Sequence, residues 1–166
     1  MNTILIIDDE AKIRSLLSRI ISLEGFQVFE ASNLKAGLKR LELSDIEIVI
    51  CDVKLPDGNG VEFSKIVKEK FPFVEIILLT AFGNIPDGVM AIKNGAFDYI
   101  TKGDDNTKIL PLIYKASDKV ALNKRVIHLE KQLNNKQSFD SIIGKSDVLI
   151  SAIDSAKKVS GTDATV

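Results

Sequence analysis

The sequence predicts an α/β fold in which helices cover a doubly wound, five-stranded parallel sheet, with an extended helix at its C-terminal side. Three observations support this. Five short apolar runs alternate with stretches that repeat apolar residues at helical spacing, which is typical of β-α-β units. Several runs are apolar almost throughout, as expected for strands buried on both faces. Residues 105 to about 136 contain one proline, near their start, and no glycine, which favours one long helix.

The first part of the chain is predicted to contain three strands and two helices. Thr3–Ile7 is the first apolar run, and apolar residues then recur at helical spacing from Ile13 to Ile21. Gln27–Ala31 is a second strand. Asn33 can cap a helix that carries three leucines at helical spacing. Ile46–Cys51 is the third strand.

The next part is predicted to contain a turn, two helices and two strands. Pro56–Gly58 has the composition of a turn, and Val61–Val67 has the spacing of a helix. Val74–Leu79 is the fourth strand. Pro86 suits the first turn of a helix, because its missing N–H has no partner there in any case. Phe97–Thr101 is the fifth strand.

Composition excludes several classes of protein. Of the 166 residues, 45% are hydrophobic, and 22 basic residues against 23 acidic ones give a net charge of −1. That balance argues against a chain built to coat nucleic acid. The single cysteine, Cys51, excludes an internal disulfide or a zinc cluster. Since no apolar stretch approaches membrane-spanning length and no signal peptide is visible, we expect no membrane contact and a cytoplasmic location.

Polar residues follow four of the predicted strands. Asp8 and Asp9 follow the first strand, Asp52 the third, Thr80 the fourth and Lys102 the fifth. In open α/β sheets the ligand crevice lies at the carboxyl ends of the strands. We therefore expect these five side chains to converge on one edge of the sheet.

Three carboxylates, a hydroxyl and an amine at one crevice suggest phosphoryl transfer to an aspartate. Asp52 is the best nucleophile candidate, because aspartates can form covalent phosphoryl intermediates. Asp8 and Asp9 would repel it unless a cation such as Mg²⁺, which prefers carboxylate and phosphate oxygens, lay between them. Lys102 would pair with a phosphoryl oxygen, and the Thr80 hydroxyl could donate to another.

The long helix carries two apolar stripes. One stripe has the 4, 3, 4 spacing of a short coiled-coil seam, which favours a homodimer; it comprises Leu122, Val126, Leu129 and Leu133. The other stripe could face the sheet or a partner; it comprises Ile113, Ala116 and Val120. The alternative is an amphipathic helix folded back on its own domain.

Four motifs, in order, make residues 2 to about 118 resemble the receiver domain of two-component response regulators. They are Ile4–Glu10, Ile50–Gly60, Leu79–Ala81 and Gly95–Lys102. The resemblance implies a flavodoxin-like sheet of order 2-1-3-4-5. One departure is Gly103, which stands where the family usually has a proline.

The resemblance also implies roles for particular residues. Asp52 would be phosphorylated by a sensor histidine kinase. Asp8, Asp9 and Asp52, with the backbone carbonyl of Lys54, would hold Mg²⁺. Thr80 and Tyr99 would act as a switch pair that reports phosphorylation.

The C-terminal part resembles the start of the AAA+ ATPase domain of NtrC-like activators, which act on the sigma-54 form of RNA polymerase. The matching segments are Phe139–Ser146 and Val159–Val166. We therefore expect a receiver domain over 1–118, a linker helix over 119–138 and a truncated ATPase fragment over 139–166. The chain itself is not expected to be an enzyme, whereas the full-length protein would contact DNA and the sigma-54 polymerase.

The leading hypothesis is a receiver that controls a transcription activator, and two alternatives stay open. One is a metal-dependent aspartyl-phosphate phosphatase of the haloacid dehalogenase type, but such enzymes usually carry Asp-x-Asp after the first strand. The other is a receiver that only dimerises and is never phosphorylated, which a degraded acid site would support.

Overall fold

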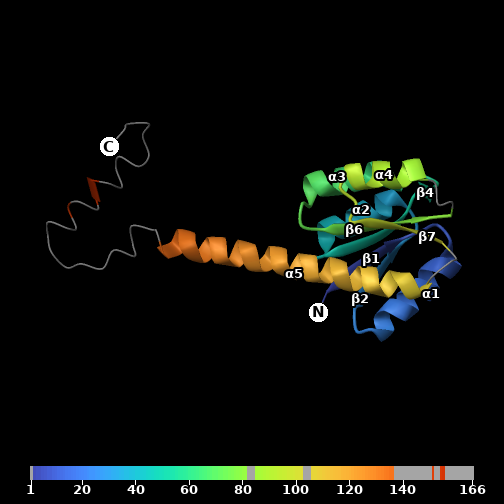
Figure 1. Cartoon of the computed structure of the whole chain (residues 1–166), viewed down its shortest axis with the longest axis horizontal. Helices are drawn as coiled ribbons and strands as arrows, with labels where there is room; N and C mark the ends of the chain where they lie inside the picture. The colour runs from blue at the N-terminus through green and yellow to red at the C-terminus, as the bar shows by residue number, and fades with distance from the viewer. Residues whose placement is uncertain (1, 82–84, 103–105, 137–150, 152–153, 156–166) are drawn as a thin grey trace. The chain divides into compact units, whose positions relative to one another are not determined.

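The computed structural model describes residues 2–81, 85–102, 106–136, 151 and 154–155 (Figure 1). The chain divides into two compact units, Met1–Asn123 and Lys124–Val166. Gly103 and nearly all of the predicted ATPase fragment lie outside the described residues, so those expectations stay predictions. Within the part of the chain that the structure describes, no helix is both long and apolar enough to cross a membrane.

Five parallel strands form the central sheet, in the order β2-β1-β3-β6-β7. Their bounds are β1 Thr3–Ile7, β2 Gln27–Ala31, β3 Ile48–Asp52, β6 Glu75–Thr80 and β7 Asp98–Thr101. This order confirms the predicted 2-1-3-4-5 topology of the five sheet strands. The third strand begins two residues later than predicted and the fourth one residue later, and both end one residue later, so that Asp52 and Thr80 are themselves the last residues of their strands.

A small antiparallel hairpin was not predicted. It consists of β4 (Lys54–Leu55) and β5 (Gly58–Asn59), with Pro56 and Asp57 of the predicted turn between them and Gly58, the third predicted turn residue, in β5. Strands of two residues are too short to show a periodic pattern in the sequence. The hairpin leads directly from the end of β3 into a helix, and it therefore brings additional backbone groups close to Asp52.

Helices cover both faces of the sheet. Their bounds are α1 Ala11–Leu23, α2 Leu34–Leu43, α3 Gly60–Lys70, α4 Ile85–Lys93 and α5 Asn106–Lys136. Figure 1 shows α2, α3 and α4 on one face, with α1 and the first part of α5 on the other. Successive residues of β1 alternate between the two cores: Ile4 and Ile6 pack with α1 and α5, and Leu5 and Ile7 with α2 and α3.

Two side chains cap the N-terminus of α2. The side chain of Asn33 accepts a hydrogen bond from the Ala36 N–H at 2.8 Å, which is the predicted cap. The carboxylate of Asp57, from the hairpin turn, accepts hydrogen bonds from the N–H groups of Leu34 and Lys35 at 3.0 Å each. Asp57 therefore ties the hairpin to α2.

The two predicted stripes of α5 have different surroundings. The first packs on the sheet, with Ile113 and Ala116 fully buried and Val120 only 3% exposed. In the second, Leu122, Val126 and Leu129 are exposed, and the side chain of Leu133 lies outside the described residues. The first stripe thus forms part of the domain core, and the coiled-coil seam stays a prediction.

Candidate functional site

Three aspartates meet at the carboxyl edge of the sheet. Asp8 directly follows β1, Asp9 is next, and Asp52 ends the neighbouring strand β3. Each offers a carboxylate oxygen within 4.8 Å of the others. Asp8 and Asp52 are buried, whereas Asp9 is exposed. The register of β1 and β3, in which Ile7 pairs with Cys51, explains why their endings lie side by side.

The loop after β1 is held from α1. Arg14 Nη1 donates to the backbone carbonyl of Asp8 at 2.7 Å and to that of Asp9 at 3.1 Å. The Glu10 N–H donates to Asp8 Oδ1 at 2.9 Å. These contacts orient both aspartates, so Arg14 and Glu10 belong to the site although the sequence analysis did not select them. Their signal was available, since Glu10 follows the acids directly and Arg14 lies one helical turn later.

Lys102 enters the same cluster from the residue after β7. Its Nζ lies 2.6 Å from Asp52 Oδ2, 2.8 Å from Asp8 Oδ2 and 3.3 Å from Glu10 Oε1. Its backbone N–H donates to the carbonyl of Thr80 at 2.6 Å, which fixes its position beside β6. The structure therefore brings Asp8, Asp9, Asp52 and Lys102 together.

The electrostatics of the cluster are unbalanced. Burial raises the pKa of the Asp52 carboxyl, and the hydrogen bond from Lys102 opposes that rise. Burial lowers the pKa of Lys102, but its contacts with Asp52 and Asp8 outweigh that effect and raise it above its usual range. Lys102 therefore stays charged, yet a single ammonium faces several carboxylates.

The residues present fit a hard divalent cation such as Mg²⁺. Its preferred protein ligands are carboxylate oxygens, and three are clustered here. Asp8 Oδ2 is buried and accepts no well-directed hydrogen bond from any described residue, although Lys102 Nζ is 2.8 Å away. A buried carboxylate oxygen without a hydrogen bond is costly unless a cation is present.

The unpredicted hairpin shapes the other side of the crevice. The Lys54 N–H donates to Asp52 Oδ1 at 3.2 Å, so both Asp52 oxygens have partners. Gly60 approaches the carbonyl of Asp52 so closely that a Cβ at this position would collide with it. A glycine is required there for α3 to begin directly behind β3.

Thr80 and Tyr99 occupy different places. Thr80 is buried at the end of β6, one residue beyond Leu79, which pairs with Asp52. Tyr99 is partly buried in β7 and its ring lies against α4, where a Cβ on Gly88 would collide with it. The structure thus puts Thr80 beside the acidic cluster, and it places the Tyr99 ring at α4.

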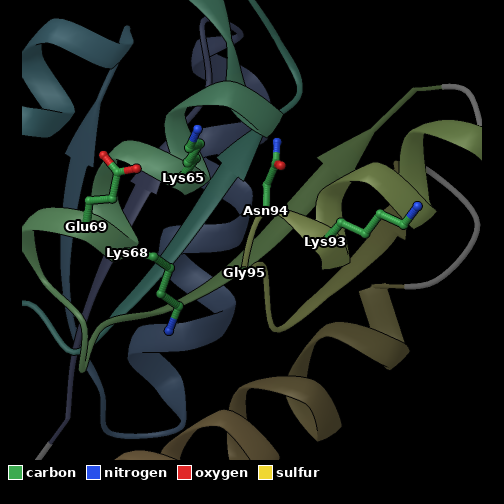
Figure 2. A pocket seen from close by; sticks show the side chains of 6 residues that line it. All are labelled: Lys65, Lys68, Glu69, Lys93, Asn94 and Gly95. Atoms are coloured by element: carbon green, nitrogen blue, oxygen red, sulfur yellow. The ribbon is translucent and has the colours of Figure 1, made fainter.

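A separate pocket of about 510 Å³ lies between the second half of α3 and the end of α4 (Figure 2). Its lining contains three lysines and one acid and comprises Lys65, Lys68, Glu69, Lys93, Asn94 and Gly95. The ammonium of Lys68 is 3.1 Å from the buried carboxylate of Glu75, at the start of β6. The pocket therefore lies toward the opposite edge of the sheet from the three aspartates.

Comparison with known proteins identifies related chains. A family model described as the response regulator receiver domain matches residues 4–114. The regulatory protein AtoC of Escherichia coli strain K12 is 26% identical over 166 residues, which are 100% of this chain and 36% of AtoC. A putative NtrX-like response regulator of Rickettsia typhi is 34% identical over 137 residues, which are 80% of this chain and 28% of that protein.

Solved structures agree with the fold. The beryllofluoride-activated NtrC4 receiver domain dimer is 32% identical, with a TM-score of 0.69; the match covers 72% of this chain and 99% of that chain. The response regulator TrrA of Thermotoga maritima, in complex with Mg²⁺ and beryllofluoride, is 28% identical, with a TM-score of 0.64 over 70% of this chain and 99% of that one. This chain spans about a third of the length of the curated relatives it matches.

Proposed function

Because the chain belongs to the response regulator receiver domain family, we propose that it is a switch controlled by phosphorylation of Asp52. The observation that carries this proposal is the charge imbalance at the site. Asp8 and Asp9 cluster with Asp52, and Lys102 is 2.6 Å from the proposed nucleophile. The result is a nucleophile beside a cation site, where a phosphoryl group can be received.

In the proposed reaction, a carboxylate oxygen of Asp52 forms the new O–P bond as the bond to the donor's leaving group breaks. Asp8, Asp9 and Asp52, with the carbonyl of Lys54, would hold Mg²⁺, which when bound offsets negative charge on the carboxylates and the phosphoryl oxygens. Lys102 would pair with a phosphoryl oxygen as a point charge. This chain would thus supply the nucleophile, the protein ligands of Mg²⁺ and the lysine that pairs with the phosphoryl group.

The proposed response uses Thr80 and Tyr99. Thr80 would turn its hydroxyl toward the phosphoryl group, and Tyr99 would move from its place at α4 into the space released. Such a change is a shift between two populated states, so substitutions at Thr80 or Tyr99 should alter the response more than the uptake of phosphate. Comparing the beryllofluoride-induced NMR shifts of α4 in wild type and Thr80→Ala tests this coupling.

The central experiment is phosphorylation by acetyl phosphate, followed by intact-mass spectrometry. Wild type should gain one phosphoryl group with Mg²⁺ and none with EDTA. Asp52→Asn should gain none, and Asp45→Asn, which removes an exposed aspartate elsewhere, should behave as wild type. Phosphorylated Asp52→Asn would refute the assignment of the acceptor.

The same experiment distinguishes the alternatives. A phosphatase would release many phosphate ions per chain, whereas we expect one stable modification with at most slow self-catalysed loss. A receiver that only dimerises would gain no mass. The adjacent placement of Asp8 and Asp9, and the complete set of acids around Lys102, support the switch.

The related proteins also support a proposal for the partners of the full-length protein. Curated relatives named as NtrC, AtoC and NtrX-like regulators support control of a sigma-54-dependent activator whose further domains contact DNA and the polymerase. A sensor histidine kinase would supply the phosphoryl group, and the cytoplasmic location that the sequence favours belongs to the same proposal. We retain the proposed boundaries of receiver, linker helix and ATPase fragment, and we expect no ATP hydrolysis by this chain.

Dimerisation is proposed through α5 and the receiver. The exposed residues Leu122, Val126 and Leu129 support it, and the related NtrC4 receiver structure is described as a dimer. Val126→Asp with Leu129→Asp should shift sedimentation from dimer toward monomer while Asp52 still accepts phosphate. A wild-type monomer at high micromolar concentration, with and without phosphorylation, would contradict the proposal.

A further inference from the structure

Lys102 contacts a third carboxylate besides the two buried aspartates, and it belongs to Glu10. Glu10 is the N-cap residue of α1, but its side chain makes no capping hydrogen bond. Its Oε1 instead lies 3.3 Å from Lys102 Nζ. The ammonium donates hydrogen bonds to Asp52 and Glu10 and lies within ion-pair distance of Asp8.

The two oxygens of Asp8 are not equally available. Oδ1 accepts the hydrogen bond from the Glu10 N–H at 2.9 Å, whereas Oδ2 faces Lys102 Nζ at 2.8 Å. The Asp8 side chain is completely buried and cannot reorient toward solvent to offer another oxygen. A divalent cation bound at Oδ2 would be repelled by an ammonium this close, so we expect Lys102 to withdraw from Asp8 Oδ2 when that oxygen becomes a ligand.

Glu10 is suited to receive the ammonium when it withdraws. Its side chain is 60% exposed, against 0% for Asp8 and 7% for Asp52, so its carboxylate has room to follow Lys102. Moving from Asp8 toward Glu10 keeps Lys102 paired with an anion throughout. It also keeps the ammonium beside Asp52, where the phosphoryl group is to be held.

We infer that Glu10 is a positioning residue, which receives Lys102 when Asp8 Oδ2 is released and thereby makes the aspartates available to a divalent cation. The inference rests on the proposed function, since it assigns a further residue to the same site. It predicts that Glu10 acts on Mg²⁺ through Lys102, in addition to any general effect of its charge.

The test is calorimetric titration of the full chain with Mg²⁺. Glu10→Gln should raise the dissociation constant of Mg²⁺ about threefold to fivefold, the upper part of the range for an exposed ion pair. The matched control is Glu62→Gln, which removes an exposed acid from the first turn of α3 and should leave the affinity unchanged. Glu10→Gln with wild-type affinity would overturn the inference.

A double-mutant cycle separates the contact from the charge. In a Lys102→Met background, Glu10→Gln should no longer weaken Mg²⁺ binding, because the ammonium it receives is gone. If Glu10→Gln weakens Mg²⁺ binding in that background as much as in wild type, Glu10 attracts the cation directly through its negative charge and not through Lys102. That result would overturn the inference. A wild-type chain that binds no Mg²⁺ would instead contradict the proposed function itself.

Phosphorylation kinetics give a second readout. With acetyl phosphate as donor, Glu10→Gln should raise the Mg²⁺ concentration needed for the half-maximal rate about threefold to fivefold. The rate at saturating Mg²⁺ should fall by a smaller factor than the Mg²⁺ requirement rises, because Lys102 and the three aspartates are intact. A reduced saturating rate with an unchanged Mg²⁺ requirement would assign Glu10 a different role.

Discussion

Two clusters of acids and lysines, each around buried carboxylates, lie at opposite edges of the same sheet, and the ion pairs of those carboxylates differ. At the carboxyl edge, one ammonium, Lys102, contacts Asp8, Glu10 and Asp52. At the amino edge, one carboxylate, Glu75, contacts two ammonium groups. Lys68 reaches it from α3 at 3.1 Å, and Lys119 reaches it from α5 at 3.0 Å.

The difference shows which cluster is able to bind a ligand. Glu75 is 1% exposed and its charge is compensated from both faces of the sheet, so it acts as a link between α3 and α5. The aspartates at the other edge keep uncompensated negative charge. This charge destabilises the fold, but it attracts cations. Burial alone does not distinguish Glu75 from Asp8 and Asp52, whereas the number of lysines paired with each carboxylate does: Glu75 has two, and Asp8 and Asp52 share one.

The largest effect is expected from removing both lysines of the amino edge. Lys68→Met with Lys119→Met leaves Glu75 buried without a cation, which should lower the free energy of unfolding by about 3–5 kcal/mol. Urea denaturation measures the loss. Exposed Lys65→Met, on the same helix as Lys68, should change stability by less than about 0.5 kcal/mol.

Mg²⁺ should stabilise the fold by binding at the carboxyl edge of the sheet, and not at the amino edge. At a hundredfold excess over its dissociation constant, Mg²⁺ should raise the free energy of unfolding by about 2.7 kcal/mol in wild type. Asp52→Asn should lose most of this gain, and Lys119→Met should retain it. Thermal unfolding with Mg²⁺ and with EDTA makes the comparison, and equal gains in all three proteins would contradict the assignment of the site.

Asp57 offers a third kind of acid, exposed and bound only by backbone donors. Burial raises the pKa of this carboxyl, but the hydrogen bonds from the backbone, those of the Leu34 and Lys35 N–H groups foremost, together outweigh burial and hold the pKa below its usual range. Its contribution should therefore be full above the unfolded pKa of about 3.9 and be lost as the pH falls through the lower folded value. Asp57→Ala should cost about 1 kcal/mol at pH 7.

That cost should shrink as the pH falls below about 4, the range in which the unfolded carboxyl takes up a proton. Denaturant melts of wild type and Asp57→Ala at pH 7 and at acidic pH provide the measurement. A difference that stays constant across this range would show that the cap does not depend on the charge of Asp57.

The smallest change in stability is expected from Asp9→Asn, and its sign should be opposite to that of the lysine substitutions at the amino edge. Asp9 is exposed and adds to the surplus of carboxylates, so Asp9→Asn should raise stability by about 0.5 kcal/mol in EDTA. With Mg²⁺ present the same substitution should be destabilising, because a ligand is lost. Destabilisation in both conditions would mean that Asp9 has a structural role like that of Glu75.

The local pattern of the sequence was sufficient for the main features of the fold. Alternating apolar runs and helical periodicity depend on neighbouring residues, and they predicted the five strands of the parallel sheet. The residue type of Asn33 predicted the cap of α2, and the resemblance to receiver domains implied the order of the strands. The strand endings placed Asp8, Asp52, Thr80 and Lys102 at one edge, because parallel strands present their carboxyl ends together.

Only the tertiary structure decided which side chains from distant parts of the sequence form ion pairs and capping contacts. The partners of Lys102 are some 50 and 90 residues away in sequence, and the two lysines of Glu75 come from helices on opposite faces. The hairpin that carries Asp57 to α2 is too short for a periodic signal. Periodicity shows which face of an element is buried, but the charge that meets a buried carboxylate depends on how the layers pack. The sequence therefore selected Asp52 as the candidate nucleophile, whereas only the tertiary structure gave Asp52 and Asp8 one shared lysine and gave Glu75 two lysines of its own.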